Sequence, residues 1–328
     1  MIRLIVSTGD TNGIGLEVFL KSLFRFRDIA AFDDVSVELV TNTKTFNDYL
    51  QFSSYSIKSI RSTGLSLIQC NTYSPIVLGE ANRRAAQLAI ESLDTAISIV
   101  TSTTNSALLT LPISKAPLQE IGWKFPGQTE FVEFHSNNRN KAMMILHHQN
   151  ISFGLATIHI PVNSVASNIT QELLTEKIFT QLAFMDYDLG VRNPKLAVLG
   201  LNPHAGEEGK IGSEDDKILK PVISRMKKER YNVEGPFPAD AFFGFGEFKR
   251  FDGILAMYHD QGLIPAKMLS NGHAVNVTAG TNIVRTSPDH GVAYPIAGKW
   301  IASEESTFQA MILATNIIRN RLRLNNQS

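Results

Sequence analysis

The sequence predicts an α/β fold, and three observations lead to that prediction. Short apolar runs alternate with longer stretches of helical periodicity along the chain. Several of the runs are followed at once by polar segments, as strands are in open α/β sheets. The length of 328 residues exceeds one small core, so we expect two domains or one large α/β domain.

The expected strands are short apolar segments, and the expected helices carry apolar residues every three or four positions. In chain order, strands are predicted at Leu4–Ser7, Ala107–Thr110, Ser152–Ile158, Leu196–Leu201 and Gly253–Met257. Helices are predicted at Ala81–Val100 and at Thr307–Leu324, and the second ends in arginines that the helix dipole favours. No Pro/Gly/Ser-rich linker is present, so several strands are expected to cross between any two domains and to leave a cleft at the centre.

The composition excludes several classes of protein. Lys plus Arg and Asp plus Glu both number 31, and the lack of a basic excess argues against a nucleic-acid partner. The single cysteine, Cys70, excludes intrachain disulfides and a cysteine zinc site, and we expect a buried hydrophobe there. The first apolar run is too short for a signal peptide, and no run approaches the ~18 residues of a membrane span. We therefore expect a cytoplasmic protein without a membrane partner.

Three of the eight histidines, His159, His204 and His259, follow predicted strands. A divalent metal needs neutral imidazoles or carboxylates held rigidly on separate segments, and strand ends provide such positions. Asp240 and Asp260 add carboxylates that could bind the metal or orient a histidine. The alternatives are that these acids cap turns and that each histidine has only a structural role.

Other polar residues and one glycine-containing segment are candidates for binding an anion or a nucleotide. Lys267, Asn276 and Arg285 are expected in loops, where they could hold a phosphate or carboxylate, although each charge could also be a solvated surface group. The segment from Thr8 to Gly15 fits neither G-x-G-x-x-G nor a P-loop. Its glycines are expected to allow a tight strand-to-helix turn, with Asp10 facing the cleft.

The longer motifs resemble one family in order and in content. They are Gly9-Asp10 through Glu17, Pro112 to Lys115, Gly127 to Phe131, Leu201 to Glu207, Gly235 to Asp240, Met257 to Lys267, Asn276 to Thr278 and Arg285 to Gly291. Together they make the chain similar to the 4-hydroxythreonine-4-phosphate dehydrogenases of pyridoxal phosphate biosynthesis. That resemblance implies a two-domain α/β fold like that of isopropylmalate and isocitrate dehydrogenases, with an interdomain active-site cleft.

The resemblance also implies which residues form each domain and what each domain binds. Residues 1–125 plus 276–328 are expected to form the domain with the NAD-side loop, and residues 126–275 the domain with the metal and substrate site and the dimer interface. The loop Asp289–Lys299 resembles the adenosine-side NAD loop of the wider superfamily. Its cofactor-binding residues would be Asp289, His290, Gly291 and Ala293.

The implied reaction is oxidation of 4-phosphooxy-L-threonine at C3 by NAD or NADP, followed by decarboxylation to 3-amino-2-oxopropyl phosphate. A homodimer is implied, in which His159 and His204 of one subunit share one zinc, magnesium or cobalt ion with His259 of the partner subunit. Substrate binding falls to Gln128, Thr129, Lys267, Asn276 and Arg285, and catalytic roles to Asp240, Asp260 and Lys267.

The chain departs from the family pattern at a few positions. Gln128 stands where the family usually has a histidine that contacts substrate, so a titratable group is replaced by a neutral amide. Thr11-Asn12, Asn282 and Val292 are further departures, which indicate lineage drift or a shift in substrate or cofactor preference. The alternatives that stay open are a dehydrogenase of erythronate or threonate 4-phosphate, a metal-dependent hydrolase, and an inactive binding homologue. The NAD-like loop counts against the hydrolase.

Overall fold

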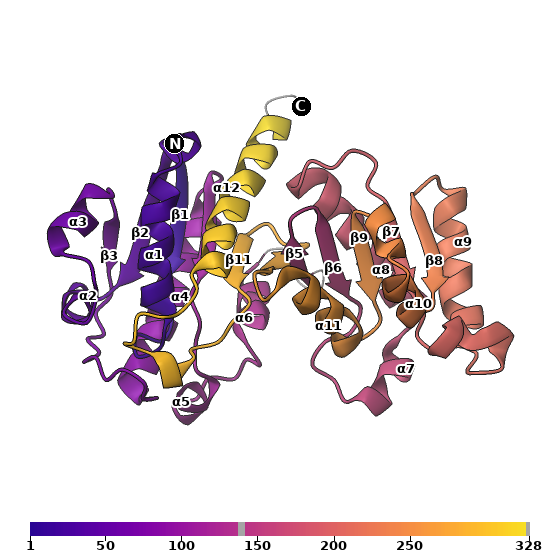
Figure 1. Ribbon diagram of the computed structural model, residues 1–328, viewed down its shortest axis with the longest axis horizontal. Coiled ribbons are helices and arrows are strands. Elements are labelled where there is room, and N and C mark those ends of the chain that lie inside the picture. Colours follow the sequence, from indigo (N-terminus) through magenta and orange to yellow (C-terminus); the bar gives the residue numbers. More distant parts are fainter. Residues whose placement is uncertain (137–141, 326–328) are drawn as a thin grey trace. The chain divides into compact units, whose positions relative to one another are not determined.

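The computed structural model describes residues 1–136 and 142–325, and it confirms the α/β fold (Figure 1). The chain divides into two compact units: of the described residues, unit 1 holds 1–136 and 281–325, and unit 2 holds 142–280. This division differs from the predicted boundaries at two elements. Residues 128–135 pack with unit 1, where Phe131 joins its core, and residues 275–279 pair with a strand of unit 2.

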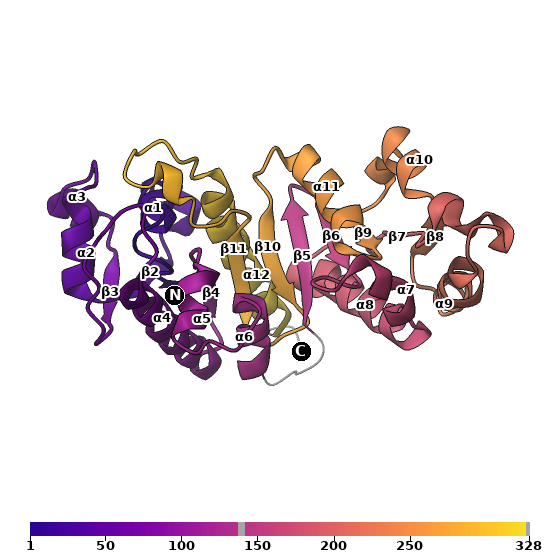
Figure 2. The same cartoon turned by 90° about the horizontal axis from the view of Figure 1, so that it is seen from below.

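Unit 1 is built on a parallel sheet in the order β3-β2-β1-β4-β11. Its strands are β1 (Ile2–Ser7), β2 (Val35–Thr41), β3 (Ser66–Gln69), β4 (Ser106–Thr110) and β11 (Val284–Pro288). Its helices are α1 (Gly15–Arg27), α2 (Thr43–Leu50), α3 (Ile57–Ser62), α4 (Arg83–Ser102), α5 (Lys115–Glu120), α6 (Gln128–His135) and α12 (Glu305–Asn325). Figure 2 shows α1 and α4 on opposite sides of this sheet, as right-handed crossovers in opposite directions require.

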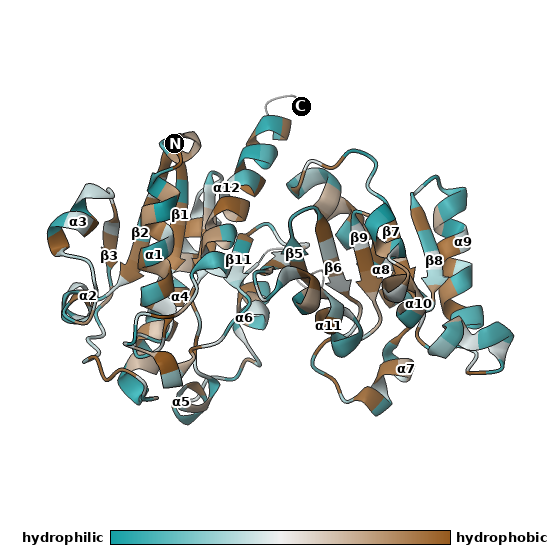
Figure 3. Ribbon diagram, viewed as in Figure 1, coloured by the Kyte–Doolittle hydropathy of each residue, from teal (hydrophilic) through white to brown (hydrophobic). Residues whose placement is uncertain are grey.

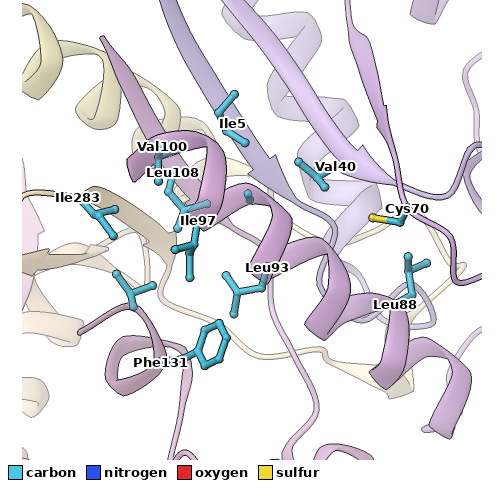
Figure 4. Packing of buried hydrophobic residues seen from close by; sticks show 12 residues of the cluster. Ile5, Val40, Cys70, Leu88, Leu93, Ile97, Val100, Leu108, Phe131 and Ile283 are labelled. Atoms are coloured by element: carbon cyan, nitrogen blue, oxygen red, sulfur yellow. The ribbon is translucent and has the colours of Figure 1, made fainter. Parts of the chain in front are cut away.

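The core of unit 1 forms where α4 and α6 pack on the strands. Leu93 and Ile97 of α4 gather in one buried cluster with Leu108 of β4 and Phe131 of α6 (Figure 4). Helix α4 is capped by Asn82, the residue before its first turn. The side chain of Asn82 accepts a hydrogen bond from the backbone N–H of Ala85.

Cys70 belongs to the same cluster and is 1% exposed, which confirms it as a buried hydrophobe. Burial raises the pKa of its thiol to about 12, and the nearby carboxylate of Glu91 acts in the same direction. The thiol is therefore protonated and unreactive at neutral pH.

Unit 2 has a mixed sheet in the order β10-β5-β6-β9-β7-β8. Strand β5 (Met143–His148) is antiparallel to β10 (Val275–Ala279) and to β6 (Ile151–Leu155), whereas β6, β9 (Gly253–Ala256), β7 (Leu196–Leu199) and β8 (Val233–Phe237) run parallel. Its helices are α7 (Val165–Asn168), α8 (Gln171–Ala183), α9 (Lys220–Lys228), α10 (Ala239–Gly244) and α11 (His259–Ser270). Because β6, β9 and β7 are parallel, their carboxyl ends meet at one edge of the sheet.

Helices α11 and α8 cover opposite faces of β6 and β9 (Figure 2). Figure 3 shows these strands as predominantly hydrophobic, in keeping with burial on both faces. Helix α11 lies very close to the sheet, since a Cβ on Gly262 would come within 2.5 Å of Leu155 Cδ2. Glycine at this position therefore fixes the depth at which the helix that begins with His259 sits.

The predicted strands and helices are all present, and the main differences are at their ends. Three predicted strands extend beyond the observed ones, because β6 ends at Leu155, β7 at Leu199 and β9 at Ala256 before the chain turns away. Within residues 1–136 and 142–325, no helix is both long enough and apolar enough to cross a membrane.

Candidate functional site

The three histidines predicted as metal ligands all lie beyond the carboxyl ends of unit 2 strands. His159 is in the loop after β6, His204 in the turn after β7, and His259 at the first residue of α11, directly after β9. Strand β9 pairs with both β6 and β7, so the three turns are neighbours along one sheet edge. The rings of His159 and His259 have their centroids 6.1 Å apart.

Asp260 holds the ring of His259. Its Oδ1 lies 2.7 Å from His259 Nδ1. A carboxylate accepts, so Nδ1 carries the hydrogen and the lone pair is left on Nε2. A carboxylate that orients an imidazole in this way is the usual support of a metal-binding histidine. The histidine side chain is 39% exposed, which leaves it open to a ligand.

His204 lies in a left-handed turn. The φ angles of His204, Ala205, Gly206, Glu207 and Glu208 are 53°, 50°, 80°, 43° and 59°. Only the glycine adopts this region freely, and each of the other residues costs about 1–2 kcal/mol there. Backbone strain of this kind persists only where surrounding contacts over-determine the conformation.

Those contacts come from Asp215, whose side chain is fully buried. Its Oδ1 accepts from the N–H of Leu201 at 2.8 Å, and its Oδ2 accepts from the N–H and the side-chain Nδ2 of Asn202 at 3.0 and 2.9 Å. One carboxylate therefore holds the backbone that leads into the left-handed turn. The same contacts set the direction in which His204 leaves strand β7.

Among the described residues, no three His, Cys, Asp or Glu side chains of one chain are grouped closely enough to hold a metal. The chain thus brings His159 and His259 together, and it holds His204 on a neighbouring turn. The three-histidine metal set, with His259 coming from a partner subunit, stays a prediction. Asp240 is exposed in the first turn of α10.

Arg285 forms the anion-binding candidate of unit 1. It is 3% exposed on β11; its Nε and Nη2 donate to Thr110 Oγ1 at 3.0 and 2.8 Å, and its Nη1 donates to Thr129 Oγ1 at 3.0 Å. Burial lowers the pKa of the guanidinium to about 10, against the opposing effect of Glu130, so it stays charged at neutral pH. A fixed, buried cation is a strong site for a phosphate or carboxylate.

The prediction that Lys267, Asn276 and Arg285 lie in loops is wrong. They lie in α11, β10 and β11 respectively. The strands were overlooked because each is short and carries polar residues. For Arg285 the surface-charge alternative is also excluded by its burial, whereas Lys267 is exposed.

Gln128 has one end of its amide in use and the other free for a ligand. It is the first residue of α6, next to Thr129, and its Nε2 donates to the carbonyl of Leu111 at 3.0 Å. Its Oε1 is buried and has no hydrogen-bond partner among the described residues. The Oδ1 of Asn276, in unit 2, is likewise buried without a hydrogen-bond partner among the described residues. Each of these oxygens could accept a hydrogen bond from a bound molecule.

The loop from Asp289 to Lys299 in unit 1 carries a similar unpaired atom. The Nδ1 of His290 lies 3.1 Å from the carbonyl of Gly291, so it carries the hydrogen and Nε2 is an acceptor. That Nε2 is buried without a partner among the described residues, and burial lowers the pKa of the ring. Next to it, Gly291 has nothing within 4 Å of where a Cβ would be, and Ala293 has a left-handed φ of 45°.

Asp10 ties this loop to the turn after β1. The hydroxyl of Tyr294 donates to its Oδ2 at 2.5 Å, and the N–H of Asn12 donates to its Oδ1 at 2.9 Å. Burial raises the pKa of Asp10, although both hydrogen bonds oppose the shift. Asp10 was expected to face a cleft, but it is 2% exposed and its carboxylate is occupied. The tight strand-to-helix turn is confirmed, since the N–H of Gly13 donates to the carbonyl of Asp10 at 3.2 Å and α1 begins two residues later.

Sequence reasoning missed Thr110, Asp215 and Tyr294, which hold Arg285, the His204 turn and Asp10. Thr110 and Tyr294 act by hydrogen bonds to segments far away in the sequence, and Asp215 bonds a turn 13–14 residues before it. Periodicity carries no information on such contacts. One signal was present for Asp215: a Cβ on Gly200 would lie 3.1 Å from its Oδ1. A glycine just before Asn-Pro-His therefore indicated that something packs closely there.

Comparison with known proteins gives one consistent result. The model of the family described as pyridoxal phosphate biosynthetic protein PdxA matches residues 24–314. A 4-hydroxythreonine-4-phosphate dehydrogenase of Bacteroides thetaiotaomicron is 37% identical to this chain, over 98% of this chain and 90% of the relative. The enzyme of the same name from a Sulfurihydrogenibium species is 35% identical, over 98% of this chain and 100% of the relative. The crystal structure of the Klebsiella pneumoniae enzyme of that name has a TM-score of 0.81 at 29% identity, over 97% of this chain and 98% of its own.

Proposed function

The chain belongs to the PdxA family and is an oxidoreductase of the 4-hydroxythreonine-4-phosphate dehydrogenase kind, and on that premise we propose that it oxidises 4-phosphooxy-L-threonine at C3 with NAD or NADP. The secondary alcohol becomes a ketone, its hydride passes to the nicotinamide and its hydroxyl proton is released. The resulting β-keto acid loses carbon dioxide and is protonated at C2, which yields 3-amino-2-oxopropyl phosphate.

One observation carries the proposal: the three histidines lie beyond the carboxyl ends of β6, β7 and β9 at one edge of the sheet, and Asp260 orients the ring of His259. The donor set suits a divalent ion, because imidazole nitrogens bind zinc, cobalt and related metals. His159 and His204 would hold the ion together with the partner subunit's His259 in a homodimer. A bound divalent ion would stabilise the negative charge that develops on the substrate oxygen during oxidation and decarboxylation.

The chain's other residues bind and orient the reactants. Arg285, kept in place by Thr110 and Thr129, supports the binding of an anionic group of the substrate. The unpaired Oε1 of Gln128 would accept a hydrogen bond from the substrate's ammonium group. Asn276 would contribute its unpaired Oδ1 in the same way, and Lys267 a positive charge.

Two acids and the loop of unit 1 complete the proposal. Asp240 and Asp260 would handle protons or support the metal ligands. The Nε2 of His290 would accept from the adenine amino group of the cofactor, with Asp289, Gly291 and Ala293 shaping the loop around it. The absence of a side chain at Gly291 leaves space for such a ligand.

The test is an assay of absorbance at 340 nm in the presence of zinc, cobalt or magnesium. We expect turnover of 4-phosphooxy-L-threonine, and we expect His204→Ala to lose metal binding and activity together. Turnover of erythronate or threonate 4-phosphate instead would overturn the substrate while leaving the reaction class. Full activity of His204→Ala would refute the metal assignment.

A further inference from the structure

Gln261 links the turn after β9 to the turn after β7. Its Oε1 accepts from the backbone N–H of Met257 at 2.7 Å, and its Nε2 donates to the backbone carbonyl of Gly200 at 2.7 Å. Both ends of the amide are therefore used, in a fixed direction. Met257 lies two residues before His259, and Gly200 lies four residues before His204.

The same link reaches the third histidine turn. The carbonyl of Met257 accepts from the hydroxyl of Thr157 at 2.7 Å and from its N–H at 3.2 Å, and Thr157 lies two residues before His159. Met257 is thus held from both sides, by Gln261 at its N–H and by Thr157 at its carbonyl.

This link lies where the sheet no longer holds the chain together. The last paired residues of β7 and β9 are Val198 and Leu255, so beyond them no strand ladder fixes the separation of the two turns. Asp215 fixes the conformation of the His204 turn itself, but it does not reach β9. In the described residues, Gln261 is the side chain seen to bridge the two backbones.

We propose that Gln261 is a positioning residue that fixes the His204 turn relative to the backbone of Met257 and, through Met257 and Thr157, relative to the His159 turn. The consequence for metal affinity rests on the proposed function, whereas the link itself does not. An amide of this length is needed, because one atom must accept and the other must donate. Glutamate keeps the acceptor for Met257 but places a second acceptor against the carbonyl of Gly200, and methionine has the length without either group.

The first test measures hydrogen exchange in the metal-free, full-length protein. Gln261→Met is expected to raise the exchange rates of the backbone amides at 200–202, 204 and 257–259 about fivefold or more, as the loss of one hydrogen bond implies. Gln261→Glu keeps the acceptor for Met257, so it is expected to raise those at 200–202 and 204. The control is Gln149→Glu, at an exposed glutamine in the turn between β5 and β6 of the same unit, which should leave both segments unchanged. Unchanged exchange at both segments in both Gln261 variants would overturn the link.

The second test measures cobalt binding by visible absorption, without turnover. Removal of a supporting partner beyond the ligands typically weakens metal binding 10–100-fold, so we expect the Kd for cobalt to rise about tenfold or more in both Gln261 variants. If His204→Ala abolishes cobalt binding while both Gln261 variants bind like the wild type, the positioning role is refuted and the proposed function stands. If His204→Ala binds cobalt normally, the proposed metal site is refuted. The exchange rates then still test whether Gln261 links the two turns.

Discussion

The left-handed turn that carries His204 depends on one buried carboxylate, and replacing that group gives a graded prediction. In Asp215→Asn the amide oxygen can keep the two bonds to Asn202, but its NH2 then faces the N–H of Leu201. One bond is lost and a buried donor is left unpaired, which costs about 2 kcal/mol. Asp215→Ala removes all three bonds and leaves the N–H groups of Leu201 and Asn202 without their acceptor, so we expect it to cost about 4 kcal/mol.

Urea unfolding followed by circular dichroism measures both losses. The matched control is Asp216→Asn, because Asp216 is the next residue and forms a partly exposed ion pair with Lys220. Such pairs contribute about 0–1 kcal/mol. If Asp215→Ala lost no more stability than Asp216→Asn, the carboxylate would not be what holds the turn.

Further predictions concern Thr110, Tyr294 and His147. Thr110→Val keeps the shape but removes the acceptor of two Arg285 bonds, so KM for the phosphorylated substrate should rise about tenfold in steady-state kinetics, and an unchanged KM would argue against this role. Tyr294→Phe takes a donor from buried Asp10 and should cost about 1–2 kcal/mol in urea unfolding, which a wild-type midpoint would contradict. Burial lowers the pKa of His147 in the folded chain to about 4. As the pH falls below 6.5, the histidine of the unfolded chain is protonated before that of the folded chain, so the free energy of unfolding should fall by up to about 3 kcal/mol between pH 6.5 and 4. His147→Phe should flatten that pH dependence of the urea midpoint, and an unaltered slope would show that another group causes it.

The sequence was sufficient to predict the fold class and the positions of the histidines. Strand-end segments such as Asn202-Pro203-His204 stand out because an apolar run stops abruptly at polar residues. Parallel strands then bring their carboxyl ends to one edge, so neighbouring turns follow from the fold class alone. The family resemblance is confirmed by the match to the PdxA family model.

The supports of the site could not be predicted in the same way. Asp215 lies in the acidic run Glu214-Asp215-Asp216, which has the appearance of a solvated helix start, yet it is fully buried. Gln261 lies within a recognised motif, but its two partners are backbone atoms at positions 257 and 200. Contacts of this kind depend on which turns the folded sheet places side by side, and they leave no periodic pattern in the sequence.

The proposed reaction is a metal-dependent oxidation coupled to decarboxylation. Its most direct test measures reduced nicotinamide and carbon dioxide in the same reaction with 4-phosphooxy-L-threonine, before and after removal of divalent metal by a chelator. We expect both products to form in equal amounts, both to stop on chelation, and both to return when metal is restored. Reduction of the nicotinamide without release of carbon dioxide, or turnover that chelation leaves unchanged, would contradict it.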